Sequence, residues 1–111
     1  MTRFEAFVAL FNEGRLAEAL GEVADGYTYT DPVFGTVRGK DAHLNVMRQV
    51  LGAYPDRTIL VIRAWAAGDL EFAEYRWQGT PAAGGDRVDL QWAVVVEYLQ
   101  DRVLHQRHYR G

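Results

Sequence analysis

In the first half of the chain, hydrophobic residues recur every three or four positions, which is the spacing of one helix face. The pattern predicts three helices, over residues 4–11, 16–23 and 41–54. Gly14 follows the first helix as a stop signal, and Pro55 closes the third. The clearest helical stripe is formed by Phe4, Phe7, Val8 and Phe11.

From residue 57 onward, hydrophobic and polar residues alternate instead, which is typical of strands with one buried face. The alternation predicts strands over 57–66, 70–79, 87–98 and 103–110, and an earlier strand over 27–31. Helices followed by mostly consecutive antiparallel strands indicate an α+β fold, with the helices covering one face of the sheet. We expect one domain over residues 1–111. The breaks between elements fall at 25–26, 35–39, 67–69, 81–85 and 100–102.

Strand alternation also predicts which side chains face the helices, because successive residues point to opposite faces of a sheet. If Asp31 points inward, Tyr29 and Tyr27 share its face. On the last strand, Gln106, His108 and Arg110 would then point inward. We therefore expect an aromatic and aliphatic pocket that holds Asp31, Tyr75 and His108. Its other predicted lining residues are Phe7, Tyr27, Tyr29, Met47, Ala73, Trp77, Trp92 and Val94.

Composition narrows the kinds of partner. The net charge of the 111 residues is −3, and Lys40 is the only lysine among 12 basic residues. The arginines are scattered, so no basic stripe exists for a nucleic-acid backbone. No apolar run is long enough for a membrane span, and there is no cysteine for disulfides or thiolate metal sites. We expect a cytoplasmic protein that binds neither nucleic acid nor membranes.

Five segments, taken in order, carry a resemblance to a known family: FNEGRLAEAL, ADGYTYTDPVFGTVRGKDAH, EYRWQGT, VDLQWAVVVEY and DRVLHQRHY. The chain resembles the SnoaL-like and ketosteroid-isomerase-like domains of the nuclear transport factor 2-like superfamily. The resemblance implies a cone-shaped fold in which a strongly bent, mostly antiparallel sheet curls around three helices and encloses a pocket. Members of this superfamily include isomerases, cyclases, dehydratases and proteins without enzymatic activity, so the fold alone does not assign a function.

Asp31, in the segment YTDPVFG, matches the position of the catalytic base in ketosteroid isomerases. A carboxylate in an apolar pocket can serve as a general base. An Asp before a Pro also favours turns without any catalytic role, and both interpretations remain open. The isomerases' two oxyanion donors correspond to Phe7 and Val94 here, so we do not expect ketosteroid isomerisation. The acid that SnoaL-like cyclases carry late on the final strand falls near Gly111.

His108 and Tyr75 are the other catalytic candidates. An Asp31–His108 pair would resemble the dyad of scytalone dehydratase, and Tyr75 could donate to a developing oxyanion. The alternatives are a satisfied or solvent-facing histidine and a half-buried aromatic residue. A metal site is not expected, because His105 and His108 point to opposite faces of a strand and His43 lies on a separate helix.

Two functions follow as hypotheses. The first is a cofactor-free acid–base enzyme of the isomerase, cyclase or dehydratase type, which acts on a small hydrophobic molecule with Asp31 as its base. The second is a non-catalytic module that binds a small ligand or dimerises. We also expect a homodimer through the outer sheet face, where Trp65 and Phe72 would expose apolar surface.

Overall fold

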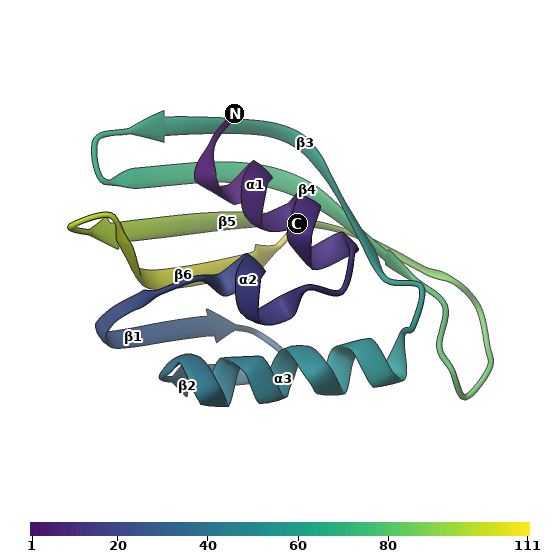
Figure 1. Cartoon of the computed structure of the whole chain (residues 1–111). Helices are drawn as coiled ribbons and strands as arrows, with labels where there is room; N and C mark the ends of the chain where they lie inside the picture. Colours follow the sequence, from purple (N-terminus) through teal and green to yellow (C-terminus); the bar gives the residue numbers. More distant parts are fainter.

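The computed structural model describes all residues from 1 to 111. One sheet of six strands has the order β2-β1-β6-β5-β4-β3, in which only the β1–β6 pair is parallel. All three helices lie on the same side of the bent sheet, with α1 and α2 across its middle and α3 beside β1 and β2 (Figure 1). The predicted α+β architecture is therefore confirmed. The elements are α1 (Arg3–Asn12), α2 (Leu16–Leu20), β1 (Val23–Asp31), β2 (Gly35–Arg38), α3 (Lys40–Ala53), β3 (Thr58–Ala67), β4 (Leu70–Gly79), β5 (Val88–Leu99) and β6 (Arg102–Arg110).

Two predictions about the first strands are wrong. The segment 25–26 does not break the chain but lies inside β1, where the pairing with β6 shifts between Val23 and Thr28. Gly26 has a φ of 80° there, which is typical of a β-bulge. The sequence pattern predicts a turn at this position, but the strand continues through the bulge. The predicted loop over 35–39 is mostly strand β2, which pairs back on β1 and places Gly35 opposite Asp31. Asp31 is therefore the last residue of β1 before the turn of the β1–β2 hairpin.

The N-terminus of α1 is capped twice. Thr2 and Glu5 form a capping box, in which each side chain bonds to the backbone N–H of the other residue. Glu71 of β4, which is buried, accepts hydrogen bonds from the backbone N–H groups of Arg3 (3.1 Å) and Phe4 (2.9 Å). A carboxylate at this position also complements the positive end of the helix dipole. The start of α1 is thus tied to the sheet.

The C-terminus of α1 is tied to β3, the edge strand beside β4. Arg57 is buried and donates to the carbonyl oxygen of Phe11 at 2.7 Å, so a cation lies at the negative end of the helix. Asn12 bonds to both backbone groups of Ile59 on the edge strand β3, at 2.9 Å to the oxygen and 2.8 Å to the nitrogen. These contacts hold α1 over the sheet and place one of its faces toward the space between α1 and α3.

The inner face of the sheet follows the predicted alternation. Tyr75, Val96, Gln106 and His108 are buried, as expected for inward side chains. Arg110 lies opposite Trp92, on the same face of the sheet, but its side chain is exposed because β6 ends there at the rim of the sheet. On the outer face, Trp65 and Phe72 lie opposite each other and remain 49% and 36% exposed. None of the three helices is long and apolar enough to span a membrane.

Candidate functional site

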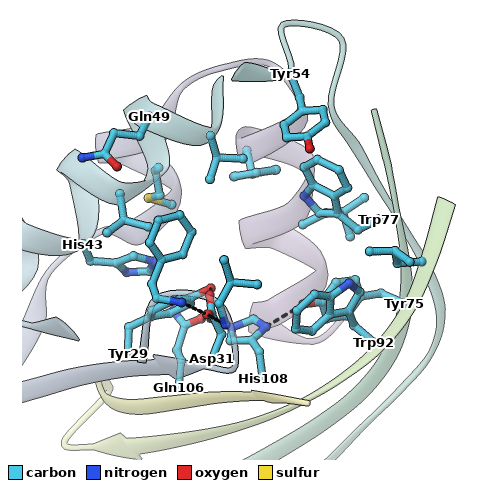
Figure 2. Close-up of a pocket in the computed structure, with 18 of the residues that line it drawn as sticks. Tyr29, Asp31, His43, Gln49, Tyr54, Tyr75, Trp77, Trp92, Gln106 and His108 are labelled. Atoms are coloured by element: carbon cyan, nitrogen blue, oxygen red, sulfur yellow. Dashed lines mark hydrogen bonds between the residues drawn. The ribbon is translucent and has the colours of Figure 1, made fainter. Parts of the chain in front are cut away.

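A cavity of about 400 Å³ lies between the inner sheet face and helices α1 and α3, and 16 of its 21 lining residues are hydrophobic. Most of its polar side chains gather at one end, and Gln49 lies apart from them (Figure 2). Figure 2 shows Tyr29, Asp31, Gln106 and His108 together at the bottom of the view, whereas Tyr54 and Trp77 lie away from them. No lysine or arginine lines the cavity, and Asp31 is its one carboxylate. The volume lies within the range of ~300 to 1,000 Å³ that is usual for small-molecule sites.

The structure brings most of the predicted site residues to this cavity. Asp31, Tyr75 and His108 line it, as do Phe7, Tyr29, Met47, Trp77 and Trp92. Tyr27, Ala73 and Val94 do not, so their prediction as lining residues is corrected. All three point inward but are buried in the core cluster. Ala73 and Val94 are small and face each other across β4 and β5. The Tyr27 hydroxyl forms a hydrogen bond with His43.

Asp31 both caps a turn and faces the cavity. Its Oδ1 accepts the backbone N–H groups of Val33 (2.7 Å) and Phe34 (2.6 Å), and its Oδ2 accepts the hydroxyl of Tyr29 (2.5 Å). Its residue is 7% exposed, and no arginine, lysine or histidine forms an ion pair with it. A carboxylate has about four lone-pair sites. Three are filled here, which leaves one on Oδ2 for a ligand.

His108 is buried rather than solvent-facing, and both of its ring nitrogens are occupied. Tyr75 donates its hydroxyl to Nδ1 at 2.6 Å, and Nε2 donates to Oε1 of Gln106 at 3.0 Å. Burial lowers the pKa of His108 to about 3, and the nearby His43 acts in the same direction. Burial, followed by the charge of Asp31, raises the pKa of Tyr75. The pair is therefore neutral at pH 7.

The expected direct pairing of Asp31 with His108 is not present. Asp31 forms its hydrogen bonds with Tyr29 and the backbone of residues 33–34. His108 forms its hydrogen bonds with Tyr75 and Gln106. The Tyr29 ring lies beside His108, with 5.0 Å between the ring centroids. The two candidates share one end of the cavity without touching through a hydrogen bond.

His43, in the first turns of α3, lines the same end of the cavity. From the sequence, we consider this residue only as a metal ligand. It is 3% exposed, its ring stacks on Tyr29 at 4.0 Å between centroids, and its Nδ1 bonds to the hydroxyl of Tyr27 at 2.8 Å. Burial lowers its pKa to about 4, although Asp31 acts in the opposite direction. A signal was present in the sequence: His43 shares a helix face with Met47, Val50 and Tyr54, which also line the cavity.

The two nearby histidines of β6 are separated by the sheet. His108 faces the cavity, whereas His105 bonds to the Thr28 hydroxyl at 2.6 Å, one register step from the inward Tyr29–Gln106 pair. No three of the His, Asp and Glu side chains lie together in a way that could hold a metal ion. The polar end of the cavity is instead suited to hydrogen bonding and proton exchange with a small molecule.

The chain belongs to the SnoaL-like domain family, whose family model matches residues 4–105. A search of curated proteins finds none that matches the sequence. Among solved structures, Bal32a from a soil-derived mobile gene cassette has a TM-score of 0.86 at 17% identity, over 97% of this chain and 86% of Bal32a.

Two other solved structures are similar in fold. SalBIII, an epoxide hydrolase/cyclase-like enzyme in pyran ring formation in the polyether salinomycin, has a TM-score of 0.83 at 17% identity, over 98% of this chain and 88% of SalBIII. A protein of ketosteroid isomerase-like fold from Catenulispora acidiphila, in complex with trimethylamine, has a TM-score of 0.82 at 18% identity, over 96% and 83% of the two chains. At such identities the likeness concerns the fold, and it confirms the predicted nuclear transport factor 2-like architecture.

Proposed function

We propose that the protein is a cofactor-free acid–base enzyme that acts on a small, largely hydrophobic molecule, with Asp31 as the general base. One observation carries the proposal: a lone carboxylate lines a cavity whose other lining residues are apolar or neutral, and no cation neutralises it. Its unfilled Oδ2 lone pair is the site that would take a proton from the substrate. Isomerisation, cyclisation and dehydration each need such a proton transfer, which contributes about 10²- to 10⁴-fold to the rate.

The rate of such an enzyme would be limited by how well the cavity stabilises a developing oxyanion. Phe7 lines the cavity and Val94 lies in the core, so neither position of the isomerases' donors offers a hydrogen bond. A single such donor is worth roughly 3 kcal/mol of transition-state stabilisation. Because the pKa of Tyr75 is raised and that of His108 is lowered, their pair is a poor proton source at pH 7. We therefore assign no proton transfer to this pair: both of its protons are already donated, and only the Tyr75 oxygen can still accept a hydrogen bond from a substrate hydroxyl.

The similarity to SalBIII supports cyclisation as one reaction type, since that epoxide hydrolase/cyclase-like enzyme has a role in pyran ring formation and shares the fold. The substrate would lie along the apolar wall formed by α1, α3, the C-terminal half of β4 and the N-terminal half of β5. Its reacting carbon or hydroxyl would approach Asp31 at the polar end.

A non-catalytic ligand-binding role is the second candidate, and the turn at residues 32–34 favours it. Both Oδ1 bonds of Asp31 hold that turn, which would account for the residue without catalysis. The same cavity would then bind an apolar ligand without changing it.

Asp31→Asn separates these two candidates. Asparagine keeps an oxygen for the Val33 and Phe34 N–H groups, so the turn is retained while the base is lost. Ligands would first be found by thermal shift, where a concentration of 100 Kd stabilises by about 2.7 kcal/mol. Under the enzyme proposal, the variant binds the same ligands and loses turnover. Equal turnover by the variant and the parent protein would reject Asp31 as the base.

We also propose that a second copy of the chain covers the outer sheet face. Trp65 and Phe72 form a cross-strand pair there, and Leu60 and Ile62 on the same strand as Trp65 are 57% and 42% exposed. The Arg63–Glu74 ion pair lies between these two groups of residues, and exposed apolar side chains flanked by charged ones in this way are typical of interfaces. Gel filtration with light scattering should show a dimer that Trp65→Glu dissociates, and a clean monomer of the parent protein at micromolar concentration would contradict the proposal.

A further inference from the structure

His43 presents the one imidazole nitrogen at the cavity that has no partner within the protein. Both nitrogens of His108 are bonded, and Nδ1 of His43 is held by Tyr27. The only buried side-chain nitrogens or oxygens that lack a partner are Arg57 Nε and Trp92 Nε1, so His43 Nε2 is open to the cavity rather than sealed in the core. A polar atom left open in an otherwise buried side chain is a natural ligand contact.

The hydrogen bonds around His43 determine which of its nitrogens carries the proton. The hydroxyl of Tyr27, a buried residue, has no hydrogen-bond partner other than His43 Nδ1. Because a buried O–H that finds no acceptor is costly, Tyr27 donates its proton to His43 Nδ1. Since burial keeps His43 neutral at pH 7, its single ring proton is on Nε2.

Two separate hydrogen-bonded groups therefore lie at this end of the cavity: Tyr75, His108 and Gln106 form one, and Tyr27 and His43 form the other. The second group ends with the Nε2–H of His43, which can still donate. A hydrogen bond accepted at Nδ1 polarises the imidazole ring and strengthens this donor. Asp31 lies beside this donor, because Tyr29 bonds to Asp31 and stacks on His43.

We propose that His43 Nε2–H binds an uncharged oxygen of the ligand, a carbonyl or a hydroxyl, next to Asp31. The charges of the cavity select this class. Asp31 is its one carboxylate and no lysine or arginine lines it, so an anionic group would meet a like charge in a medium of low dielectric constant. A neutral oxygen satisfies the open N–H and leaves the Oδ2 lone pair of Asp31 for an adjacent acidic C–H or O–H.

This inference uses the cavity of the proposed function, but it concerns recognition and needs no turnover. Its test employs four probes of similar shape: 2-acetylnaphthalene, 2-isopropenylnaphthalene, 2-naphthoate and 1-(2-naphthyl)ethylamine. We expect the ketone to bind about 5- to 10-fold more tightly than the alkene, which is the effect of one hydrogen bond. The carboxylate should bind most weakly. Tightest binding of the carboxylate or of the ammonium probe would overturn the assignment of an uncharged oxygen.

Variants of His43 test the donor itself. His43→Asn retains an oxygen for Tyr27 but removes the donor to the cavity, and His43→Gln retains an N–H near the position of Nε2. His105→Asn is the matched control, because His105 bonds to Thr28 outside the cavity. Infrared spectra of bound 2-acetylnaphthalene with a ¹³C-labelled carbonyl should show a lowered stretching frequency in the parent protein, in His43→Gln and in His105→Asn. His43→Asn should bind about 5- to 10-fold more weakly and return the frequency toward its value in an apolar solvent.

The outcomes separate the two proposals. If the ketone binds His43→Asn with the same affinity and carbonyl frequency as the parent protein, His43 is only a structural partner of Tyr27 and the inference fails, while binding in the cavity stands. If Asp31→Asn leaves turnover unchanged while the carbonyl shift still depends on His43, the catalytic proposal fails and the inference stands. Absence of binding by all four probes would overturn both.

Discussion

Two buried carboxylates in this protein have nearly the same hydrogen bonds and different surroundings. Asp31 and Glu71 are 7% and 6% exposed, and each accepts two consecutive backbone N–H groups and one tyrosine hydroxyl. For Asp31 the donors come from a turn and Tyr29. For Glu71 they come from the start of α1 and from Tyr98. The hydrogen-bond pattern alone would assign both residues the same role.

What separates them is the space beside each carboxylate. Asp31 lines the cavity of about 400 Å³, whereas Glu71 does not. Glu71 lies between α1 and the sheet, where its bonds hold a helix end in place. A satisfied carboxylate is thus a structural feature by default, and it becomes a candidate for chemistry only where a ligand can reach its remaining lone pair. If this difference in surroundings is a difference in function, substitutions at the two carboxylates should have different effects.

The largest effect is expected for Asp31→Asn. Turnover should fall by ~10²- to 10⁴-fold because the base is lost, while ligand affinity and the unfolding midpoint change little. The measurement is kcat and Kd on one substrate. The control is Glu71→Gln, whose activity per folded molecule should equal that of the parent protein, and a comparable loss of turnover in that control would erase the distinction between the two carboxylates.

Glu71→Ala should instead lower the free energy of unfolding, by about 3 kcal/mol. The substitution leaves the N–H groups of Arg3 and Phe4 and the hydroxyl of Tyr98 without their acceptor, and each unsatisfied buried group costs about 1–3 kcal/mol. Urea denaturation measures the change. A loss below about 1 kcal/mol would show that water replaces the carboxylate and that α1 does not depend on it.

Acid should weaken the fold through the histidines beside Asp31. The folded pKa values of His43 and His108, about 4 and about 3, lie below the unfolded value of roughly 6.5. Between these limits the unfolded chain binds more protons, so stability is fully present above pH 6.5 and is lost as the pH falls toward 4. The slope per histidine reaches about 1.4 kcal/mol per pH unit.

Urea midpoints between pH 4.5 and 8 test this pH dependence. His108→Gln should reduce the slope below pH 6.5, and so should His43→Asn. A stability that is constant from pH 8 to 4.5 would contradict the buried, neutral state of the two rings at the polar end of the cavity.

The smallest effect comes from the two tyrosines that bond to the carboxylates. Tyr98→Phe and Tyr29→Phe each remove one hydroxyl donor, so each should cost about 1 kcal/mol of stability. Only Tyr29→Phe should also change the pH–rate profile, because it frees a second lone pair on Oδ2 of the proposed base. If both variants alter the profile equally, the effect is transmitted through the fold and not through Asp31.

Much of this arrangement was accessible from sequence periodicity. The helical stripe of α1 and the alternation of β4, β5 and β6 correctly placed Phe7, Tyr75 and His108 on the inner face. Local pattern failed where the backbone departs from regular geometry. The bulge at Gly26 resembles a turn in sequence, and β2 has too few apolar residues to stand out from a loop.

Sequence periodicity could not predict which side chains form hydrogen bonds with one another. Tyr27 and His43 belong to different elements, and the acceptors of Tyr75 and Tyr98 lie on other strands. Which of several inward polar groups pair with one another depends on distances across the assembled sheet. The expected Asp31–His108 dyad was wrong for this reason, since Tyr29 and Gln106 were equally inward and lay closer.

Asn12 has a consequence for the behaviour of the protein at high concentration. Strand β3 is an edge of the sheet, and its unpaired backbone groups would be a template for strands of other molecules. By bonding to both the N–H and the carbonyl of Ile59, the Asn12 amide occupies the place that an incoming strand would take. The residue that anchors α1 thereby also protects the edge from intermolecular sheet extension, so Asn12→Ala should promote aggregation as well as loosen the helix.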